Sequence, residues 1–213
     1  SHETKVEGGD VLIARTDITI IGSGVRTSTQ GIDFIINQMK QRKERHYVVV
    51  QQLPEKPESF IHLDMVFTLL DHNQCMVYEP VVLRPGNLFT ILIEIDNGSI
   101  KRIEKKQNLL ACLSELGMDL NPILCGGNKD IWNSEREQWH SGANFFAIAP
   151  GKVIGYERNI YTMEAMNNQG YEIIPAIDVL NNSIDLNRYN KYVVTIEGSE
   201  LARGGGGARC MTM

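Results

Sequence analysis

The chain has 213 residues, of which 42% are hydrophobic and 22% are charged, and its formal net charge is -5. This composition is typical of a globular chain long enough to bury one sizeable core, and we expect a single domain. No run approaches the roughly 18 consecutive apolar residues of a membrane-spanning helix, so no membrane span is expected. No basic cluster is broader than the one over residues 40–45. Nucleic acid is therefore not an expected partner, because binding it normally requires a basic face.

The sequence contains four cysteines, Cys75, Cys112, Cys125 and Cys210. They form no CxxC pair and are too sparse for the disulfide framework of a small secreted domain, and no apolar signal segment opens the chain. We therefore expect a reducing, cytoplasmic setting. The sequence begins with Ser rather than Met and stops just after a glycine-rich run and a cysteine, so we expect it to be a fragment.

Secondary structure is predicted first in the opening quarter of the chain. β-Branched residues favour two short strands, over residues 11–13 and 17–21. Thr27 or Ser28 is a candidate helix N-cap. Four apolar residues then recur at helical spacing, Ile32, Ile35, Ile36 and Met39. A strand over residues 47–50 completes the order strand, strand, helix, strand.

The same order is predicted to recur twice along the chain. The second unit has strands over residues 66–70 and 75–78, a helix over 108–116 and a strand over 122–125. The third has strands over residues 145–149 and 153–156, a helix over 161–167 and a strand over 171–174. Residues 94–106 predict a solvated hairpin around an Asn-Gly turn. Three such units indicate a repeat architecture of small mixed sheets.

Cys210 is the best candidate for a nucleophile. It follows a run of four glycines, and glycine runs occur where backbone must approach a neighbour closely or adopt positive φ. Arg203 and Arg209 flank it and would favour the thiolate. The alternative is a flexible tail with an incidental cysteine. The other three cysteines lie in apolar stretches, where they are expected to be core residues.

Two further groups of polar residues could share in the chemistry. His62 and Asp64 are predicted on one face of a strand over residues 61–70, where they could relay protons or form only a structural ion pair. Glu7 and Asp10 surround two glycines, which could instead form a simple turn capped by Asp10. Arg26 could likewise be only a solvated residue near a helix start. Together these groups suit attack on a cationic carbon.

These residues fall in seven segments that, in this order, resemble the arginine deiminase family of the guanidino-modifying enzyme superfamily, which has the pentein fold. The segments are residues 7–10, 22–28, 62–68, 136–139, 142–151, 156–159 and 203–212. The HLDMVFT and GGGGARCMTM elements are the most specific of them. The resemblance covers nearly the whole chain.

The resemblance implies an α/β fold, a pentein-type propeller of five ββαβ units, with about three of the five units plus the C-terminal catalytic loop present here. Residues 1–213 would then form a partial pentein catalytic domain that lacks its N-terminal portion. The implied reaction converts L-arginine and water to L-citrulline and ammonia without a metal or organic cofactor. A homo-oligomer is also plausible for this family.

The resemblance also implies roles for individual residues. Cys210 would attack the guanidinium carbon, expel ammonia and leave a covalent thiouronium adduct that water hydrolyses. His62 would act as general acid and base, and Glu7 would hold and polarise it. Asp64 would accept hydrogen bonds from the guanidinium, and Arg26 would bind the substrate's α-carboxylate. For Asp10 we expect only support of the loop.

Two departures from the family pattern affect these expectations. The half of the family's domain that is absent here supplies a second guanidinium-binding aspartate and another arginine, so we expect this chain alone to be inactive. Gly205 stands near a position where some relatives carry an arginine. Two other readings stay open at this stage. One is a hydrolase or amidinotransferase acting on agmatine, methylated arginine or peptidyl arginine, and the other is a non-catalytic pentein fragment. Arg26 favours free arginine among these substrates.

Overall fold

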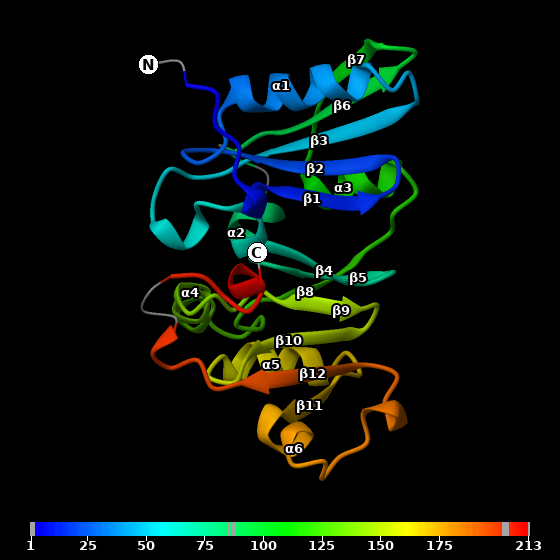
Figure 1. The fold of residues 1–213 in the computed structure, drawn as a ribbon. Helices are drawn as coiled ribbons and strands as arrows, with labels where there is room; N and C mark the ends of the chain where they lie inside the picture. Colours follow the sequence, from blue (N-terminus) through cyan, green and yellow to red (C-terminus); the bar gives the residue numbers. More distant parts are fainter. Residues whose placement is uncertain (1–2, 85, 87, 202–204, 213) are drawn as a thin grey trace. The chain divides into compact units, whose positions relative to one another are not determined.

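A computed structural model describes residues 3–84, 86, 88–201 and 205–212 (Figure 1). Its contacts divide the chain into two compact units. The N-terminal unit comprises Ser1–Asp64 and Pro80–Asp119, and the C-terminal unit comprises Met65–Glu79 and Leu120–Met213. The expectation that residues 1–213 form one partial domain stays a prediction.

The described residues of the N-terminal unit form a five-stranded sheet in the order β1-β2-β3-β6-β7. Its strands are β1 (Val11–Arg15), β2 (Ile18–Ser23), β3 (His46–Gln52), β6 (Thr90–Asp96) and β7 (Ser99–Lys106). β1 and β2 are antiparallel, and β2 and β3 are parallel. Helix α1 (Thr29–Lys40) provides the crossover between the parallel strands, so the predicted strand, strand, helix, strand order of this unit is confirmed.

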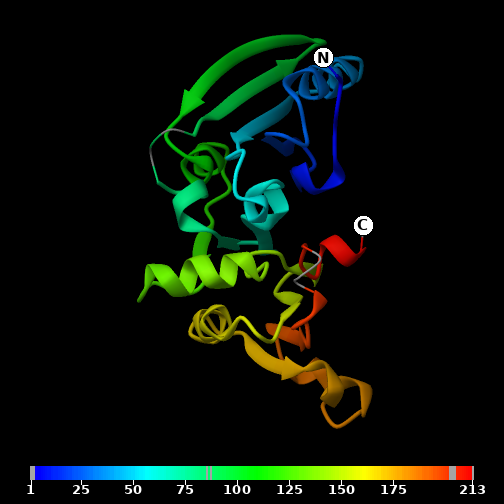
Figure 2. The ribbon, with the colours of Figure 1, turned by 90° about the vertical axis from the view of Figure 1, so that its left-hand side faces the viewer.

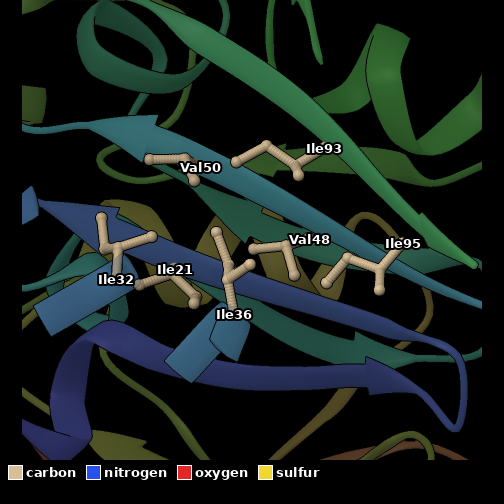
Figure 3. Packing of buried hydrophobic residues seen from close by; sticks show 7 residues of the cluster. All are labelled: Ile21, Ile32, Ile36, Val48, Val50, Ile93 and Ile95. Carbon is tan, nitrogen blue, oxygen red and sulfur yellow. The ribbon is translucent and has the colours of Figure 1, made fainter. Parts of the chain in front are cut away.

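Helix α1 begins where its sequence provides a cap and an apolar stripe. The Ser28 side chain accepts a hydrogen bond from Gly31 N at 3.1 Å, which selects Ser28 over Thr27 as the N-cap. The apolar stripe packs onto the sheet in a cluster of Ile21, Ile32, Ile36, Val48, Val50, Ile93 and Ile95 (Figure 3). Burial of each such side chain contributes roughly 1.5–3 kcal/mol, so the cluster stabilises the packing of α1 on the sheet.

The sheet of the N-terminal unit is covered on both faces at β3. Val48, Val49 and Val50 are consecutive and all buried, whereas a half-exposed strand would alternate. Helix α3 (Leu109–Glu115) also packs against β3, β6 and β7. Its N-cap is Asn108, whose side chain accepts from Ala111 N at 2.9 Å.

The predicted hairpin in this unit is confirmed. Asn97 and Gly98 connect β6 to β7 with φ values of 48° and 74°, the left-handed conformations that a tight hairpin turn requires. The pairing register shifts between Glu94 and Ile95. Such an irregularity bends a pair of strands, and Figure 2 shows β6 and β7, in green, as two long curved strands.

Two smaller sheets form in the described part of the C-terminal unit. One has the order β4-β5-β8, and the other has the order β11-β12-β10-β9. The strands are β4 (Phe67–Asp71), β5 (Gln74–Val77), β8 (Asn121–Leu124), β9 (Phe146–Ala149), β10 (Lys152–Tyr156), β11 (Glu172–Pro175) and β12 (Tyr192–Ile196). The helices are α4 (Ile131–Trp139), α5 (Ile160–Asn167) and α6 (Ala176–Leu180). Ile174, Tyr192 and Val194 form a core cluster against which Ala176 and Val179 of α6 pack.

Short helical segments complete the described elements. They are the α-helix α2 (Glu79–Val82) and the 3-10 turns η1 (Gly8–Asp10), η2 (Glu58–Phe60), η3 (Leu63–Met65), η4 (Leu186–Arg188) and η6 (Cys210–Thr212). Within the described residues, no helix combines the length and the apolar character needed to cross a membrane.

The α/β class with mixed sheets is confirmed, and the third unit has its predicted elements in the order β9, β10, α5, β11. An additional strand, β12, inserts between β10 and β11 and pairs in parallel with both. One sequence-based expectation is wrong. The strand expected over residues 61–70 begins only at Phe67, since η3 occupies Leu63–Met65. Hydrogen bonds from elsewhere in the chain override the local strand pattern there.

Candidate functional site

An imidazole and a carboxylate form a close pair within the N-terminal unit. His62 Nε2 lies 2.6 Å from Glu7 Oε2, although the two residues are 55 positions apart. The His62 side chain is 20% exposed and that of Glu7 is 41% exposed, so both can be reached from solvent. Glu7 N also donates to Thr27 Oγ1 at 3.1 Å, which fixes the backbone that carries the carboxylate. Such a pair can orient the ring and pass a proton.

Gly9 lets the backbone between Glu7 and Asp10 approach two of the expected site residues closely. A Cβ atom at Gly9 would lie 3.0 Å from His62 Cγ and 3.2 Å from Asp64 Oδ1. The imidazole and the Asp64 carboxylate therefore rest against the same piece of backbone, where a side chain would crowd them. His62 and Asp64 are brought together as the sequence analysis expected, but by this contact and η3 rather than by one face of a strand.

Asp10 holds the segment that carries His62. Its Oδ1 accepts a hydrogen bond from Leu63 N at 2.9 Å, and the side chain is fully buried. Burial raises the pKa of Asp10 to about 6, against the opposing effects of hydrogen bonds from Thr27 and Leu63 and of the His62 charge. Asp10 thus supports the loop from beneath, and the simple turn considered for residues 7–10 is in fact the 3-10 turn η1.

Arg26 lies on the exposed side of the same group. Its Nη1 is 3.5 Å from Glu7 Oε1, and half of its side chain is exposed. An ion pair this open to water adds little to stability, so the guanidinium can exchange Glu7 for another anion at low cost. Asp64, by contrast, is fully buried. The structure thus brings together four of the residues expected in the site, Glu7, Arg26, His62 and Asp64.

Cys210 opens η6 in the C-terminal unit and is partly exposed. Gly206 has φ +92°, and a Cβ there would lie 2.9 Å from Cys210 Cβ and 3.4 Å from its Sγ. Gly205 also has positive φ, +77°. The glycines before the cysteine therefore meet both conditions expected of them, close approach and left-handed backbone. Arg203 and its expected effect on the thiol lie outside the described residues.

The other cysteines are buried, as expected. Burial raises the pKa of Cys75 to about 12 and that of Cys112 to about 11. The pKa of Cys125 is also raised by burial, and its Sγ accepts a hydrogen bond from Thr162 Oγ1. Because only the thiolate is a good nucleophile, these three thiols are inert by comparison with a partly exposed one.

Sequence reasoning missed two residues around the Cys210 loop. Asn144 Oδ1 accepts hydrogen bonds from Arg209 N at 2.9 Å and Cys210 N at 3.4 Å. Tyr156 donates its hydroxyl to Gly206 O at 3.2 Å. Both residues lie in segments that carry the family resemblance, and that position was the only feature of the sequence that pointed to them. Neither carries a chemical pattern that identifies its role without the fold.

The described side chains offer little sign of a metal centre. Among them, no group of three or more His, Cys, Asp or Glu residues is placed to hold a metal ion. A cavity of about 290 Å³ lies in the C-terminal unit, lined mainly by β8, α5 and the segment from Gly126 to Asn133. It contains none of the residues expected in the site.

Two sequence comparisons match nearly the whole chain to known proteins. The arginine deiminase family model matches residues 1–213. The chain is 35% identical to the arginine deiminase of Mycoplasma capricolum subsp. capricolum over 99% of its own length and 47% of the relative's. It therefore spans about half the length of that curated relative.

Two solved structures show a similar fold. The product-bound N-terminal domain of ArgZ, an arginine dihydrolase of the cyanobacterial ornithine-ammonia cycle, has a TM-score of 0.55 and 15% identity over 95% of this chain and 53% of that one. A dimethylarginine dimethylaminohydrolase adduct has a TM-score of 0.55 and 18% identity over 99% of this chain and 58% of that one. These likenesses support the pentein type of fold, and closure of a five-unit propeller stays a prediction. By its family match and its 35% identity to a curated relative, the chain belongs to the arginine deiminase family.

Proposed function

We propose that this chain is the nucleophile-bearing part of a guanidino-group hydrolase that converts L-arginine and water to L-citrulline and ammonia. The observation that carries the proposal is the Glu7–His62 pair, 2.6 Å apart, beside Asp64 at Gly9, in a chain that also retains Cys210. A cationic, planar substrate needs acceptors and a proton carrier, and these residues provide both.

The first half of the proposed reaction forms a covalent adduct. The Cys210 thiolate attacks the guanidinium carbon, and a tetrahedral intermediate forms. His62, held by Glu7, gives a proton to the departing nitrogen, so that ammonia leaves and a thiouronium cation stays on the sulfur. Nucleophilic catalysis of this kind divides one difficult displacement into two easier steps.

The second half returns the enzyme to its starting state. His62, now neutral, takes a proton from a water molecule, whose oxygen attacks the thiouronium carbon. The second tetrahedral intermediate collapses, the carbon–sulfur bond breaks, and the proton left on its hydroxyl goes to solvent, so that citrulline is released with the thiolate restored. The balance is one arginine cation and one water consumed for one citrulline and one ammonium ion formed, because ammonia takes up the released proton.

Asp64 and Arg26 are assigned to substrate binding. Asp64 accepts hydrogen bonds from the guanidinium, whose planar fork of donors suits a carboxylate. Arg26 binds the α-carboxylate, and its half-exposed side chain is available for this because its contact with Glu7 is long and open to water. A substrate without a free carboxylate, such as agmatine or a peptidyl arginine, gains nothing from Arg26, which favours free arginine.

Relatives of the same fold support the covalent route. The N-terminal domain of an ArgZ variant has been solved covalently bonded to a reaction intermediate, and the dimethylarginine dimethylaminohydrolase structure is an adduct. The proposed reaction needs no metal or organic cofactor. We further propose that the 213-residue chain is inactive alone, because the other half of the family's domain supplies a second guanidinium-binding aspartate. A non-catalytic pentein fragment is then the description of this chain in isolation.

The test is citrulline formation in two preparations. One is this chain alone, and the other is a longer chain in which it is joined to the part of the Mycoplasma capricolum enzyme that it does not match. We expect the longer chain to form citrulline from L-arginine and the chain alone to form none. Cys210→Ala should abolish the product, and Arg26→Ala should chiefly raise KM.

Two outcomes would contradict the proposal. Full citrulline formation by Cys210→Ala would exclude the covalent route. Faster turnover of agmatine, methylarginine or a peptidyl arginine than of L-arginine would exclude the assigned substrate. Cys112→Ala is the matched control, since it removes a buried thiol with a raised pKa and should leave turnover unchanged in the folded fraction.

A further inference from the structure

The loop that carries Cys210 is attached to a distant buried side chain. Asn144, which is 2% exposed, accepts hydrogen bonds through Oδ1 from the backbone N–H groups of Arg209 at 2.9 Å and of Cys210 at 3.4 Å. Two adjacent backbone N–H groups directed at one oxygen leave the peptide between these residues little freedom to rotate. The direction of the Cys210 Cα–Cβ bond is set by that peptide.

Asn144 itself stands on a turn that is fixed to the sheet. Ser141, at the start of this turn, has φ 58°, and its carbonyl accepts from Asn144 N at 3.0 Å. Thr68, on β4, donates its hydroxyl to Ala143 O at 2.7 Å. The turn is therefore held by its own backbone and by a strand, so that Asn144 can act as a fixed reference point.

The loop is also held on its other side. A Cβ at Gly207 would lie 2.5 Å from Asn144 Oδ1, so the loop backbone packs directly on the amide and only glycine fits there. The Tyr156 hydroxyl donates to Gly206 O at 3.2 Å, ahead of the cysteine. Contacts at Gly206 and Gly207, together with those at Arg209 and Cys210, hold the loop in one position along the segment that leads to the thiol.

The chemical type of the acceptor is as informative as its position. An aspartate has the same shape and would accept the same two N–H groups, but it would bring a negative charge close to the Cys210 sulfur. A nearby negative charge disfavours the thiolate. The amide of asparagine accepts the hydrogen bonds without this charge.

We propose that Asn144 is the positioning residue of the Cys210 loop, in which a neutral side-chain oxygen fixes the peptide between Arg209 and Cys210 and thereby the direction of the thiol. The part of this proposal that concerns catalysis rests on the proposed function of Cys210. The geometric part does not, and it can be tested on the 213-residue chain without any turnover.

The test compares Asn144→Ala with Asn144→Asp by two measurements on the folded chain. Hydrogen exchange, followed by mass spectrometry of the peptide over residues 205–212, measures how well the backbone N–H groups of Arg209 and Cys210 are protected. We expect exchange there to accelerate at least about tenfold in Asn144→Ala and to stay near wild type in Asn144→Asp, which keeps the acceptor. Asn37→Ala and Asn37→Asp, at an exposed site on α1, are the matched controls.

The second measurement is the pH dependence of Cys210 alkylation by iodoacetamide. We expect the midpoint to move to higher pH in Asn144→Asp, so that alkylation at pH 7 slows about three- to tenfold, while Asn37→Asp leaves it unchanged. A purely structural role for Asn144 would not produce this difference between the two aspartate variants.

Three results would overturn the proposal. They are unchanged exchange in Asn144→Ala, an unchanged alkylation midpoint in Asn144→Asp, and loss of folding in Asn144→Asp, which retains the acceptor. If Asn144→Ala does not fold, the comparison of Asn144→Asp with wild type carries the test. If exchange and alkylation behave as expected but the longer chain forms no citrulline, the proposed function fails while the positioning role stands.

Discussion

The group around His62 and the loop around Cys210 are built by different means. In the first, side chains bind side chains across long separations in sequence, as in the Glu7–His62 pair, and a buried Asp10 holds the backbone beneath. In the second, backbone groups of the loop that carries the thiol bind the neutral side chains of Asn144 and Tyr156. The first region organises charge, and the second organises geometry.

This difference predicts how each region fails. Changes around His62 should alter protonation and leave the backbone in place. Changes around Cys210 that introduce no charge should alter the direction or exposure of the thiol and leave its chemistry unchanged. The following predictions separate the two kinds of failure, from the largest expected effect to the smallest.

Glu7→Gln should have the largest effect, about a 100- to 10,000-fold loss of kcat in the longer, active chain. The amide keeps the size of the side chain but removes the charge that holds His62 for proton transfer. The measurement is steady-state citrulline formation. Glu3→Gln, which removes an exposed carboxylate paired with Lys5, is the control and should have no effect. Equal losses in both variants would mean that Glu7 acts only through net charge.

Alkylation of the four thiols should separate Cys210 from the buried cysteines. At pH 8 we expect iodoacetamide to modify Cys210 about 100-fold faster than Cys75 or Cys112, because burial raises the pKa of both buried thiols and limits access to them. Peptide mapping by mass spectrometry measures the four rates. In denaturant the rates should converge, and failure of Cys210 to lead in the folded chain would contradict the assignment of its loop.

Gly22→Ala should destabilise the N-terminal unit. The added Cβ would lie 2.5 Å from Asp10 Oδ1 and 2.9 Å from Leu53 Cδ1, inside a packed region. Overpacking of this kind costs about 1–3 kcal/mol of unfolding free energy. Denaturant unfolding measures the change. Gly170→Ala is a useful contrast, since a Cβ there meets nothing within 4 Å and only its φ of +87° opposes the substitution. A smaller loss at Gly22 than at Gly170 would contradict the packing described around Asp10.

Asp10→Asn should change how stability depends on pH. The folded-state pKa of Asp10, about 6, lies above its ordinary value of 3.8, so the folded chain binds more protons than the unfolded chain between these values. The stability that Asp10 contributes is therefore present below pH 4 and is lost as the pH rises through 6. Asparagine does not titrate and keeps the oxygen that accepts from Leu63 N.

The measurement for Asp10→Asn is the free energy of unfolding at pH 4 and at pH 7. The free energy of unfolding of the variant, relative to that of wild type, should increase by about 1–3 kcal/mol from pH 4 to pH 7. Asp33→Asn, at an exposed position on α1, should show no such trend. A variant that loses stability relative to wild type as the pH rises would show that Asp10 is held charged by its partners.

Several features could be read from sequence because short-range chemistry decides them. The Asn97-Gly98 hairpin and the Ser28 cap depend on residues within a few positions of one another. The run of glycines before Cys210 also predicted a constrained backbone, and Gly205 and Gly206 have positive φ. The family resemblance added the selection of His62, Glu7 and Cys210, which spacing alone left open.

The tertiary structure decided what depends on distant partners. β12 enters between β10 and β11, which no periodicity in the third repeat indicated. Residues Leu63–Met65 form a 3-10 turn rather than a strand, because Asp10 takes the Leu63 N–H that a strand would offer to its neighbour. The role of Asn144 depends on the hydrogen bond that its Oδ1 accepts from Cys210 N, 66 positions away in the sequence. Local sequence determines which backbone conformations have low energy. The partner of each buried N–H group, by contrast, is determined only when segments distant in sequence come into contact.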